Sequence, residues 1–299
     1  MVFTPNLIIA GVAKCGTTTL HDLLACHPRV TGGIEKEVRF LMDREDPLCP
    51  PVNYHACGIE AWASQYRDGG TGDFDIWMDA SPQYQYQSRA REVIATLDPQ
   101  PFVLFITRDP VRRLFSLYQY GRYHHRKLPH INSFGDFIEE VREPVGAQTA
   151  KQRMMQSAWR DSQYDLMLEQ WRAVMEPGKL RAITLEELNA DREGTLVSLA
   201  LWLGLEPYQL LNAQTDRSNP TIVTKSRFVR DVGAKVAKIL PENRAVRALK
   251  TRVREMNSAP VDHDEIDQNA PLMAALEAEF ATSTARYERL REELSRTTC

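Results

Sequence analysis

The segment GVAKCGTTTL, residues 11–20, contains the residue types of a phosphate-binding loop. Its two glycines have the spacing found in nucleoside-triphosphate-binding loops, where a lysine follows the second glycine and reaches the β- and γ-phosphates. In this chain Thr17 stands at that position, and the lysine, Lys14, lies inside the loop. The segment therefore predicts an anion site over residues 12–19 that differs from the site of a triphosphate-dependent kinase.

The residues around this loop indicate a strand that leads into a helix. The apolar run NLIIA precedes the loop, and a helix is predicted over residues 17–26, where the pair HP stops it. A glycine-rich turn that opens a helix offers free N–H groups and the positive end of the helix to an anion. Taken alone, the motif also fits an ordinary strand-to-helix turn with an incidental lysine.

A second candidate phosphate site follows the apolar run FVLFIT. Asp109 is placed to cap a helix whose first residue is the proline after it. Arg108, Arg112 and Ser116 then follow at four-residue intervals, close to one helical face. Arg108 and Ser116 together offer a forked, charge-assisted contact and a hydroxyl donor. The alternative is a capped surface helix with solvated arginines.

The elements that must position these motifs alternate along the chain. Buried strands are predicted at residues 7–12, 76–81, 102–107 and 180–184, with helical segments between and after them. Such alternation predicts an α/β fold with a P-loop-like, doubly wound parallel β-sheet flanked by helices. From about residue 217 onward the pattern indicates polar helices without clear strands, which gives a helical C-terminal region. We expect residues 1–299 to form a single domain.

Composition excludes several classes of protein. The net charge of −3 gives no overall attraction to nucleic acid or to an anionic membrane, so no nucleic-acid partner is expected. Five scattered cysteines without a C-x-x-C pair argue against a disulfide framework and a zinc site. No apolar stretch approaches the roughly 18 residues of a membrane span, and the N-terminus lacks signal-peptide features. We therefore expect a cytoplasmic protein without a membrane span.

The two motifs together resemble those of the sulfotransferases that use 3′-phosphoadenosine 5′-phosphosulfate (PAPS). GVAKCGTTTL resembles their 5′-phosphosulfate loop, and RDPVRRLFSLY resembles their 3′-phosphate segment. The segment HPRVTGGIEKEVRFL is similar to the HP…KEVHFF segment of the branch that contains heparan sulfate N- and 3-O-sulfotransferases and many bacterial enzymes. The resemblance implies a sulfotransferase domain with PAPS as co-substrate and no required metal.

The resemblance also assigns residues that bind the donor. Lys14 would neutralise the charge that grows on the leaving phosphate, and Arg108 and Ser116 would hold the 3′-phosphate. Lys225 and Arg227 lie where the family has a loop that covers the nucleotide, although a generic basic helix face fits them equally well. The other implied donor contacts are Cys15, Gly16, Thr17, Thr18 and Thr19.

The acceptor requires a base, and the resemblance places it at Glu37, which matches the glutamate of KEVHFF. A carboxylate can take a proton from an acceptor hydroxyl when its surroundings raise its pKa toward neutrality. Glu35 is the nearest rival because it would share a face with Glu37 in an extended segment. His124 and His125 are alternatives, since soluble aryl sulfotransferases use a histidine base.

Departures from the branch bear on the acceptor. The heparan-modifying enzymes have a lysine where this chain has Ala80, and Arg39 replaces the histidine of EVHFF. We therefore expect a bacterial enzyme that sulfates a hydroxyl, or as the weaker alternative an amine, of a small molecule, natural product or glycoconjugate. Tyr84 and Tyr86, just past a predicted strand, are candidates for lining the acceptor pocket.

Two other classes of function stay open on the sequence. A P-loop kinase would need a lysine after Gly16 and a metal-binding acid, and the chain lacks the former. A non-catalytic nucleotide-binding protein would need no base near the loop, so binding without turnover would identify it.

Overall fold

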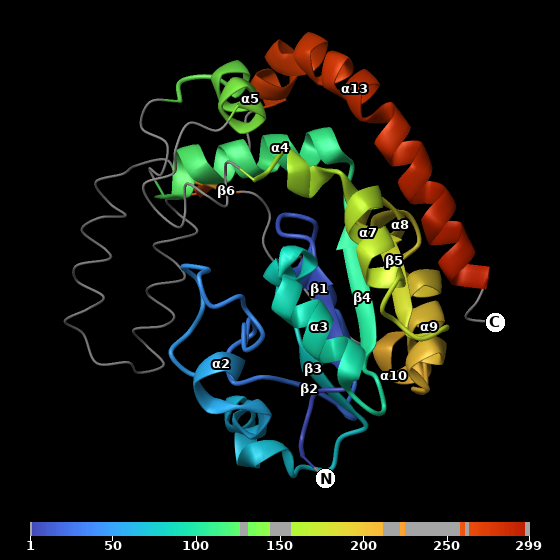
Figure 1. The fold of residues 1–299 in the computed structure, drawn as a ribbon. Coiled ribbons are helices and arrows are strands. Elements are labelled where there is room, and N and C mark those ends of the chain that lie inside the picture. Colours follow the sequence, from blue (N-terminus) through green and yellow to red (C-terminus); the bar gives the residue numbers. More distant parts are fainter. Residues whose placement is uncertain are drawn as a thin grey trace.

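The computed structural model has a parallel β-sheet at its centre (Figure 1). It describes residues 2–125, 131–143, 157–211, 222–224, 258–260 and 263–296. The five strands follow the order β2-β3-β1-β4-β5, and every neighbouring pair is parallel. They are β1 Leu7–Gly11, β2 Val30–Gly32, β3 Ile76–Asp79, β4 Phe102–Thr107 and β5 Leu180–Thr184. This arrangement confirms the predicted α/β fold with a P-loop-like, doubly wound sheet.

Short strands are where the sequence prediction was wrong. The sequence does not predict β2, because its residues VTG are too few to show a periodic pattern. It also predicts no strand beyond about residue 217, whereas β6 (Ile222–Thr224) and β7 (Ser258–Pro260) pair antiparallel in a small second sheet. Pairing with a distant segment defines such strands more than local pattern does.

Helices cover both faces of the central sheet (Figure 1). The α-helices are α1 Thr17–Leu24, α2 Tyr54–Cys57, α3 Ser88–Thr96, α4 Pro110–Gln119, α5 Phe134–Arg142, α7 Tyr164–Arg172, α8 Leu185–Ala190, α9 Arg192–Leu203, α10 Tyr208–Leu211 and α13 His263–Arg296. Short 3₁₀ helices span Ile59–Gln65, Arg67–Gly70, Pro82–Tyr86 and Arg160–Ser162, and a π-helical segment spans Tyr120–His125.

The two faces of the sheet are covered by different helices. Leucines of α1 and α9 pack on one face, against Ile9 of β1 and Leu104 of β4. The other face packs against α3, α7 and α13, where Trp171 lies over Phe105 with ring centroids 5.6 Å apart. All five residues of β1 are buried, as expected for a central strand that is covered on both sides. The loop after β1 therefore starts from a rigid support.

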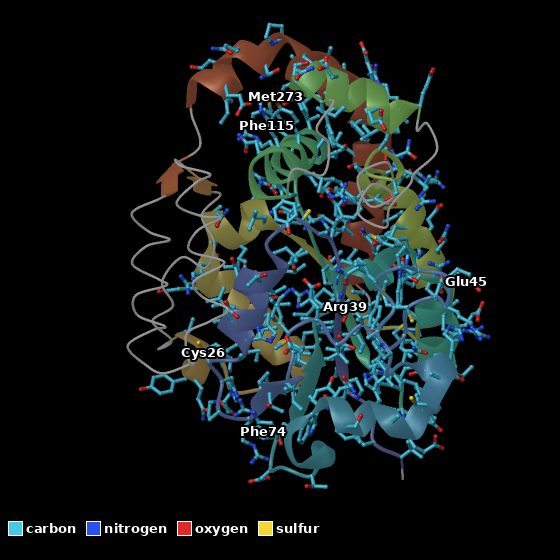
Figure 2. All side chains as sticks on the ribbon, turned by 90° about the vertical axis from the view of Figure 1, so that its left-hand side faces the viewer. Cys26, Arg39, Glu45, Phe74, Phe115 and Met273 are labelled. Carbon is cyan, nitrogen blue, oxygen red and sulfur yellow. The ribbon has the colours of Figure 1, made fainter. Side chains whose placement is uncertain are left out.

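A third apolar cluster joins α4 to α5 and to the first half of α13. Figure 2 shows two of its members, Phe115 of α4 and Met273 of α13, next to each other at the top of that view. Figure 1 shows α4 lying across the end of the sheet. This cluster fixes α4 relative to α5 and α13.

The long helix α13 confirms the predicted helical C-terminal region, and it packs along α7, β5 and α4. The Tyr287 hydroxyl lies 2.8 Å from the hydroxyl of Thr107, the last residue of β4. Arg291 pairs with Glu187 of α8 at 2.6 Å. These contacts fix the end of β4, from which Arg108 follows.

A buried hydrogen-bond network ties the segment after residue 37 to the end of β3. Asp79 is fully buried and accepts hydrogen bonds from Ser81 at 2.5 Å and from Tyr84 at 2.9 Å. The Ser81 hydroxyl accepts from the Arg39 amide, and the Tyr84 hydroxyl accepts from the Leu41 amide. Burial raises the pKa of Asp79 to about 6, although the two donated hydrogen bonds oppose this shift.

We expect Asp79→Asn to change how stability depends on pH. The pKa of Asp79 is about 6 in the folded protein and 3.8 for an ordinary aspartate, so the native state keeps this proton longer than the unfolded chain. Its contribution to the free energy of unfolding is therefore full below about pH 4 and falls by about 3 kcal/mol as the pH rises through 6. Urea unfolding between about pH 4 and pH 7 should show the wild type losing stability relative to the variant.

Asp267→Asn, on the exposed side of α13, is the matched control for an aspartate-to-asparagine change at the surface. A difference between wild type and Asp79→Asn that stays constant over this pH range would contradict the raised pKa of Asp79.

Candidate functional site

The loop between β1 and α1 has the backbone geometry of an anion cradle. The Val12 amide donates to the Ile106 carbonyl at 2.8 Å, which ties the start of the loop to β4. Lys14 and Gly16 have φ angles of 71° and 93°, in the left-handed region. A Cβ on Gly16 would also lie 2.7 Å from a methyl carbon of Leu185, so this turn requires glycine.

The first turn of α1 is open to a ligand at its N-terminal end. Its N-cap residue is Gly16, no side chain within the described residues caps it, and its first turn contains no acidic residue. Helix N-termini present unpaired N–H groups and a partial positive charge. Thr17 is buried, while Thr18 and Thr19 are half-buried. These features fit the predicted phosphate contacts of the loop.

Two cations meet at this edge of the sheet. Burial and then the nearby positive charge of Arg108 lower the pKa of Lys14. Across the described ranges neither side chain forms an ion pair with a carboxylate. Cations without counter-ions attract anions strongly where water is partly excluded. The structure thus brings together the two basic residues that the sequence singled out.

The helix α4 begins as predicted, with Pro110 in its first position and the Asp109 carboxylate accepting from the Arg112 amide at 2.7 Å. Ser116 is 6% exposed on the buried side of this helix, and its hydroxyl makes no hydrogen bond within the part of the chain that the structure describes. Arg112, which lies at the four-residue spacing between Arg108 and Ser116, has an exposed side chain. The arginine that faces the loop is Arg113.

Arg113 is 2% exposed and donates from Nε to the carbonyl oxygen of Ala13 at 3.1 Å. Arg113, Ser116 and Tyr120 share one face of the helix, because Ser116 lies three residues after Arg113 and Tyr120 lies four residues after Ser116. Residue 112 is turned by about 100° from it, which places it in solvent. Once α4 is docked, one face of the helix bears the residues that touch the loop.

Cys15 does not face the anion cradle. Its thiol is buried, lies 3.8 Å from the Tyr164 hydroxyl, and has a pKa raised to about 11 by burial. Its amide donates to the Val12 carbonyl at 3.1 Å. Neither group points to a ligand in the loop, so we leave Cys15 out of the proposed donor contacts.

Glu37 lies between a cation and an amide. One carboxylate oxygen is 3.5 Å from the Lys36 ammonium, and the other accepts from the Gln83 side-chain N–H at 2.9 Å. Glu35 is exposed to solvent, which makes it the weaker of the two glutamates for a site. Gln83 is 7% exposed, and its carbonyl oxygen has no hydrogen-bond partner among the described residues.

Tyr120 connects the two halves of the site. The Lys14 ammonium lies 4.2 Å from the centroid of its ring, a cation–π contact. Burial raises the pKa of Tyr120, and the negative charge of Glu37 raises it further. Tyr120 therefore contacts the loop lysine, and the charge of the candidate base acts on its hydroxyl.

The predicted acceptor role of Tyr84 was wrong. Its ring is fully buried, and its hydroxyl is bonded to Asp79 and to the Leu41 amide, so it belongs to the core. Tyr86 is half-buried, and the carboxylates that raise its pKa, after burial, are Asp161 and Asp46 rather than Glu37.

Some predicted residues cannot be placed. Lys225 and Arg227 lie outside the described residues, and so do the side chains of His124 and His125. In the described ranges no group of three His, Cys, Asp or Glu side chains is arranged to hold a metal ion. None of the helices in those ranges has the length and apolar character that crossing a membrane requires.

The sequence missed three residues of the site: Arg113, Tyr120 and Gln83. The adjacent arginines 112 and 113 were visible, but the residue types alone do not say which one faces the loop. The spacing of 113, 116 and 120 was a usable signal, because these positions share one helical face. For Gln83 the sequence offered no signal, since its contact with Glu37 joins segments 46 residues apart.

Comparisons with known proteins agree with this geometry. The family model described as the sulfotransferase domain matches residues 4–228. Bifunctional heparan sulfate N-deacetylase/N-sulfotransferase 4 of Mus musculus is 25% identical over 205 residues, which cover 68% of this chain and 23% of that protein. Bifunctional heparan sulfate N-deacetylase/N-sulfotransferase 2 of Homo sapiens is 23% identical over 205 residues, which cover 68% of this chain and 22% of that protein. The chain thus spans about a quarter of the length of these curated relatives.

Solved structures share the fold. A sulfotransferase from Alicyclobacillus acidocaldarius superposes with a TM-score of 0.61 at 19% identity, covering 97% of both chains. A mouse sulfotransferase complexed with PAP gives a TM-score of 0.52 at 14% identity, covering 99% of this chain and 89% of that one. Because the domain match extends over most of its length, this chain belongs to the sulfotransferase domain family.

Proposed function

We propose that the enzyme transfers a sulfuryl group from PAPS, in line, to an acceptor hydroxyl, with Glu37 as general base. The observation that carries this proposal is the loop after β1, where Lys14 and the uncapped N-terminus of α1 form an anion cradle, together with a Glu37 carboxylate held by Gln83 at 2.9 Å. An amine acceptor is the second candidate, because the names of the curated relatives include N-sulfotransferase.

The residues present fit a donor with two separate phosphates. The loop that ends at Gly16 offers backbone N–H groups, and Lys14 and Arg108 supply charges that no carboxylate in the described ranges neutralises. We assign the 5′-phosphosulfate to the loop, with Thr17, Thr18 and Thr19, and the 3′-phosphate to Arg108 and Ser116. Lys225 and Arg227 remain proposed nucleotide-covering residues. No metal is required, because these cations balance the phosphate charges.

In the reaction that we propose, the Glu37 carboxylate takes the proton of the acceptor hydroxyl as the acceptor oxygen bonds to sulfur. The bond from sulfur to the 5′-phosphate oxygen breaks, and its electron pair leaves on that phosphate. Lys14 neutralises the charge that develops there. Gln83 and Lys36 hold the carboxylate in place through their contacts at 2.9 and 3.5 Å.

We propose a small molecule, natural product or glycoconjugate as the acceptor. Ala80, at the position of the lysine in heparan-modifying enzymes, is fully buried, so this point offers no charge to a polyanionic chain. Free thiols exposed at Cys26 and Cys57 fit a reducing compartment, which supports the cytoplasm as the proposed location. A bacterial source stays a prediction of the sequence resemblance, because solved structures at 19% and 14% identity support the fold alone. Incubation with labelled PAPS and a panel of sugars, phenols, amines and lipids tests the class of acceptor.

Nucleotide selectivity gives a first test that needs no acceptor. The desulfated product, 3′,5′-bisphosphoadenosine (PAP), should bind in the presence of EDTA, and ATP should bind at least about tenfold more weakly, because we assign Arg108 and Ser116 to a 3′-phosphate that ATP lacks. Isothermal titration calorimetry measures both affinities. Equal or tighter binding of Mg-ATP would support the kinase alternative instead.

The two phosphate sites should respond differently to mutation. Arg108→Ala should raise the KM for PAPS by about 10- to 100-fold, because its contact is to a phosphate that does not change during the reaction. Lys14→Ala should mainly lower kcat, by about 10²- to 10³-fold, because its charge acts on the leaving phosphate. Steady-state kinetics with varied PAPS separate the two effects, and the exposed Arg112→Ala is the control. Identical profiles for the two variants would refute the separate roles.

For the base, Glu37→Gln should reduce kcat by about 10²- to 10⁴-fold, because the amide keeps the shape of the side chain but cannot take a proton. PAP affinity should be almost unchanged, since the carboxylate serves the acceptor. Glu35→Gln tests the neighbouring glutamate, to which the large loss moves if Glu35 is the base, and His124→Gln and His125→Gln test the histidine alternative in the same way. Turnover and PAP affinity of the four variants decide, and a Glu37→Gln enzyme with more than about a tenth of wild-type kcat removes Glu37 from the mechanism.

A further inference from the structure

Arg113 is a buried cation whose partners are all uncharged. It is 2% exposed, and besides the Ala13 carbonyl it binds the Ala158 carbonyl at 3.0 Å and the Ser162 hydroxyl at 2.7 Å. Buried arginines are usually paired with carboxylates. Arg113 has no such ion pair in the described part of the chain. The burial of the Arg113 charge therefore needs an explanation other than a salt bridge.

The contact with Ala13 fixes the direction of a peptide group in the donor loop. The peptide between Ala13 and Lys14 is trans, so its carbonyl and its N–H point in opposite directions. The carbonyl oxygen points toward Arg113, at 3.1 Å. The Lys14 N–H therefore points away from Arg113, and it makes no hydrogen bond within the described ranges.

The other contacts of Arg113 anchor it from behind the loop. The Ser162 hydroxyl accepts from Arg113 and donates to the Ala158 carbonyl at 2.8 Å, and Ser162 is 1% exposed. Tyr164, two residues further on, lies 3.8 Å from the thiol of Cys15. The segment 158–164 thus forms a rigid backing for the loop, and Arg113 is the link between them.

We propose that Arg113 is a positioning residue of the 5′-phosphate site: it holds the Ala13–Lys14 peptide so that the Lys14 N–H faces the phosphate, and it adds a positive charge behind the loop. This inference rests on the proposed function. The positive charge of Arg113 also acts on its surroundings, since it lowers the pKa values of Cys15 and Tyr164 against the larger effect of burial.

The role predicts a loss that is specific to one phosphate. PAP carries both phosphates, whereas adenosine 3′-monophosphate lacks the 5′-phosphate, so the ratio of their affinities measures the contribution of the loop. Arg113→Met should weaken PAP binding by about tenfold or more and leave binding of the monophosphate within about twofold. Arg112→Met is the matched control, since it removes a neighbouring arginine that is exposed, and it should change neither affinity.

Calorimetry on the full chain gives both dissociation constants, and thermal unfolding checks that each variant is folded. If Arg113→Met does not fold, Arg113→Lys and Ser162→Ala provide the same test. Lysine cannot reproduce the three contacts, and alanine removes the hydroxyl that orients the guanidinium. Both should weaken PAP binding selectively, by about threefold or more.

Three results would overturn the inference. The first is an equal loss of both ligands in the folded variants, which would indicate a general structural role. The second is an unchanged affinity for PAP, and the third is a wild-type protein that binds PAP no better than the monophosphate. A wild-type protein that binds neither ligand would instead contradict the proposed function itself.

Discussion

The parallel pairing of β1 with β4 is the constraint on which the rest of this site depends. It keeps Lys14 and Arg108, which follow these two strands, at the same edge of the sheet. Burial and the charge of Arg108 both lower the pKa of Lys14, so keeping both cations charged costs free energy that the packed core must offset. An anion bound between them would relieve this cost.

The helix α4 places side chains next to the loop at this edge of the sheet. Its start is fixed by the Asp109 cap and by Pro110, and the packing of its apolar face against α5 and α13 sets its rotation. Arg113, Ser116 and Tyr120 then fall on one face. They contact the back of the loop, present a hydroxyl, and pack against the Lys14 ammonium, respectively. A single helix therefore carries three side chains of the candidate site.

The acceptor side is anchored independently of the donor side. Asp79 and its hydrogen-bonded partners hold the amides of Arg39 and Leu41, which fixes the segment that follows Glu37. On the donor side, α13 braces the end of β4 through Tyr287. The two anchors share no residue, so the segment after Glu37 and the end of β4 are held independently of each other.

The sequence by itself determined the parts that depend on local pattern: the longer strands, the glycine-rich loop with Lys14, and the capped helix after Arg108. Tertiary structure decided which of the adjacent arginines 112 and 113 faces the loop, because neighbours on a helix point about 100° apart and only packing sets their rotation. It also decided that Tyr84 is a core anchor rather than an acceptor contact. Its hydroxyl meets Asp79 and the 39–41 segment only after residues distant in sequence have packed together.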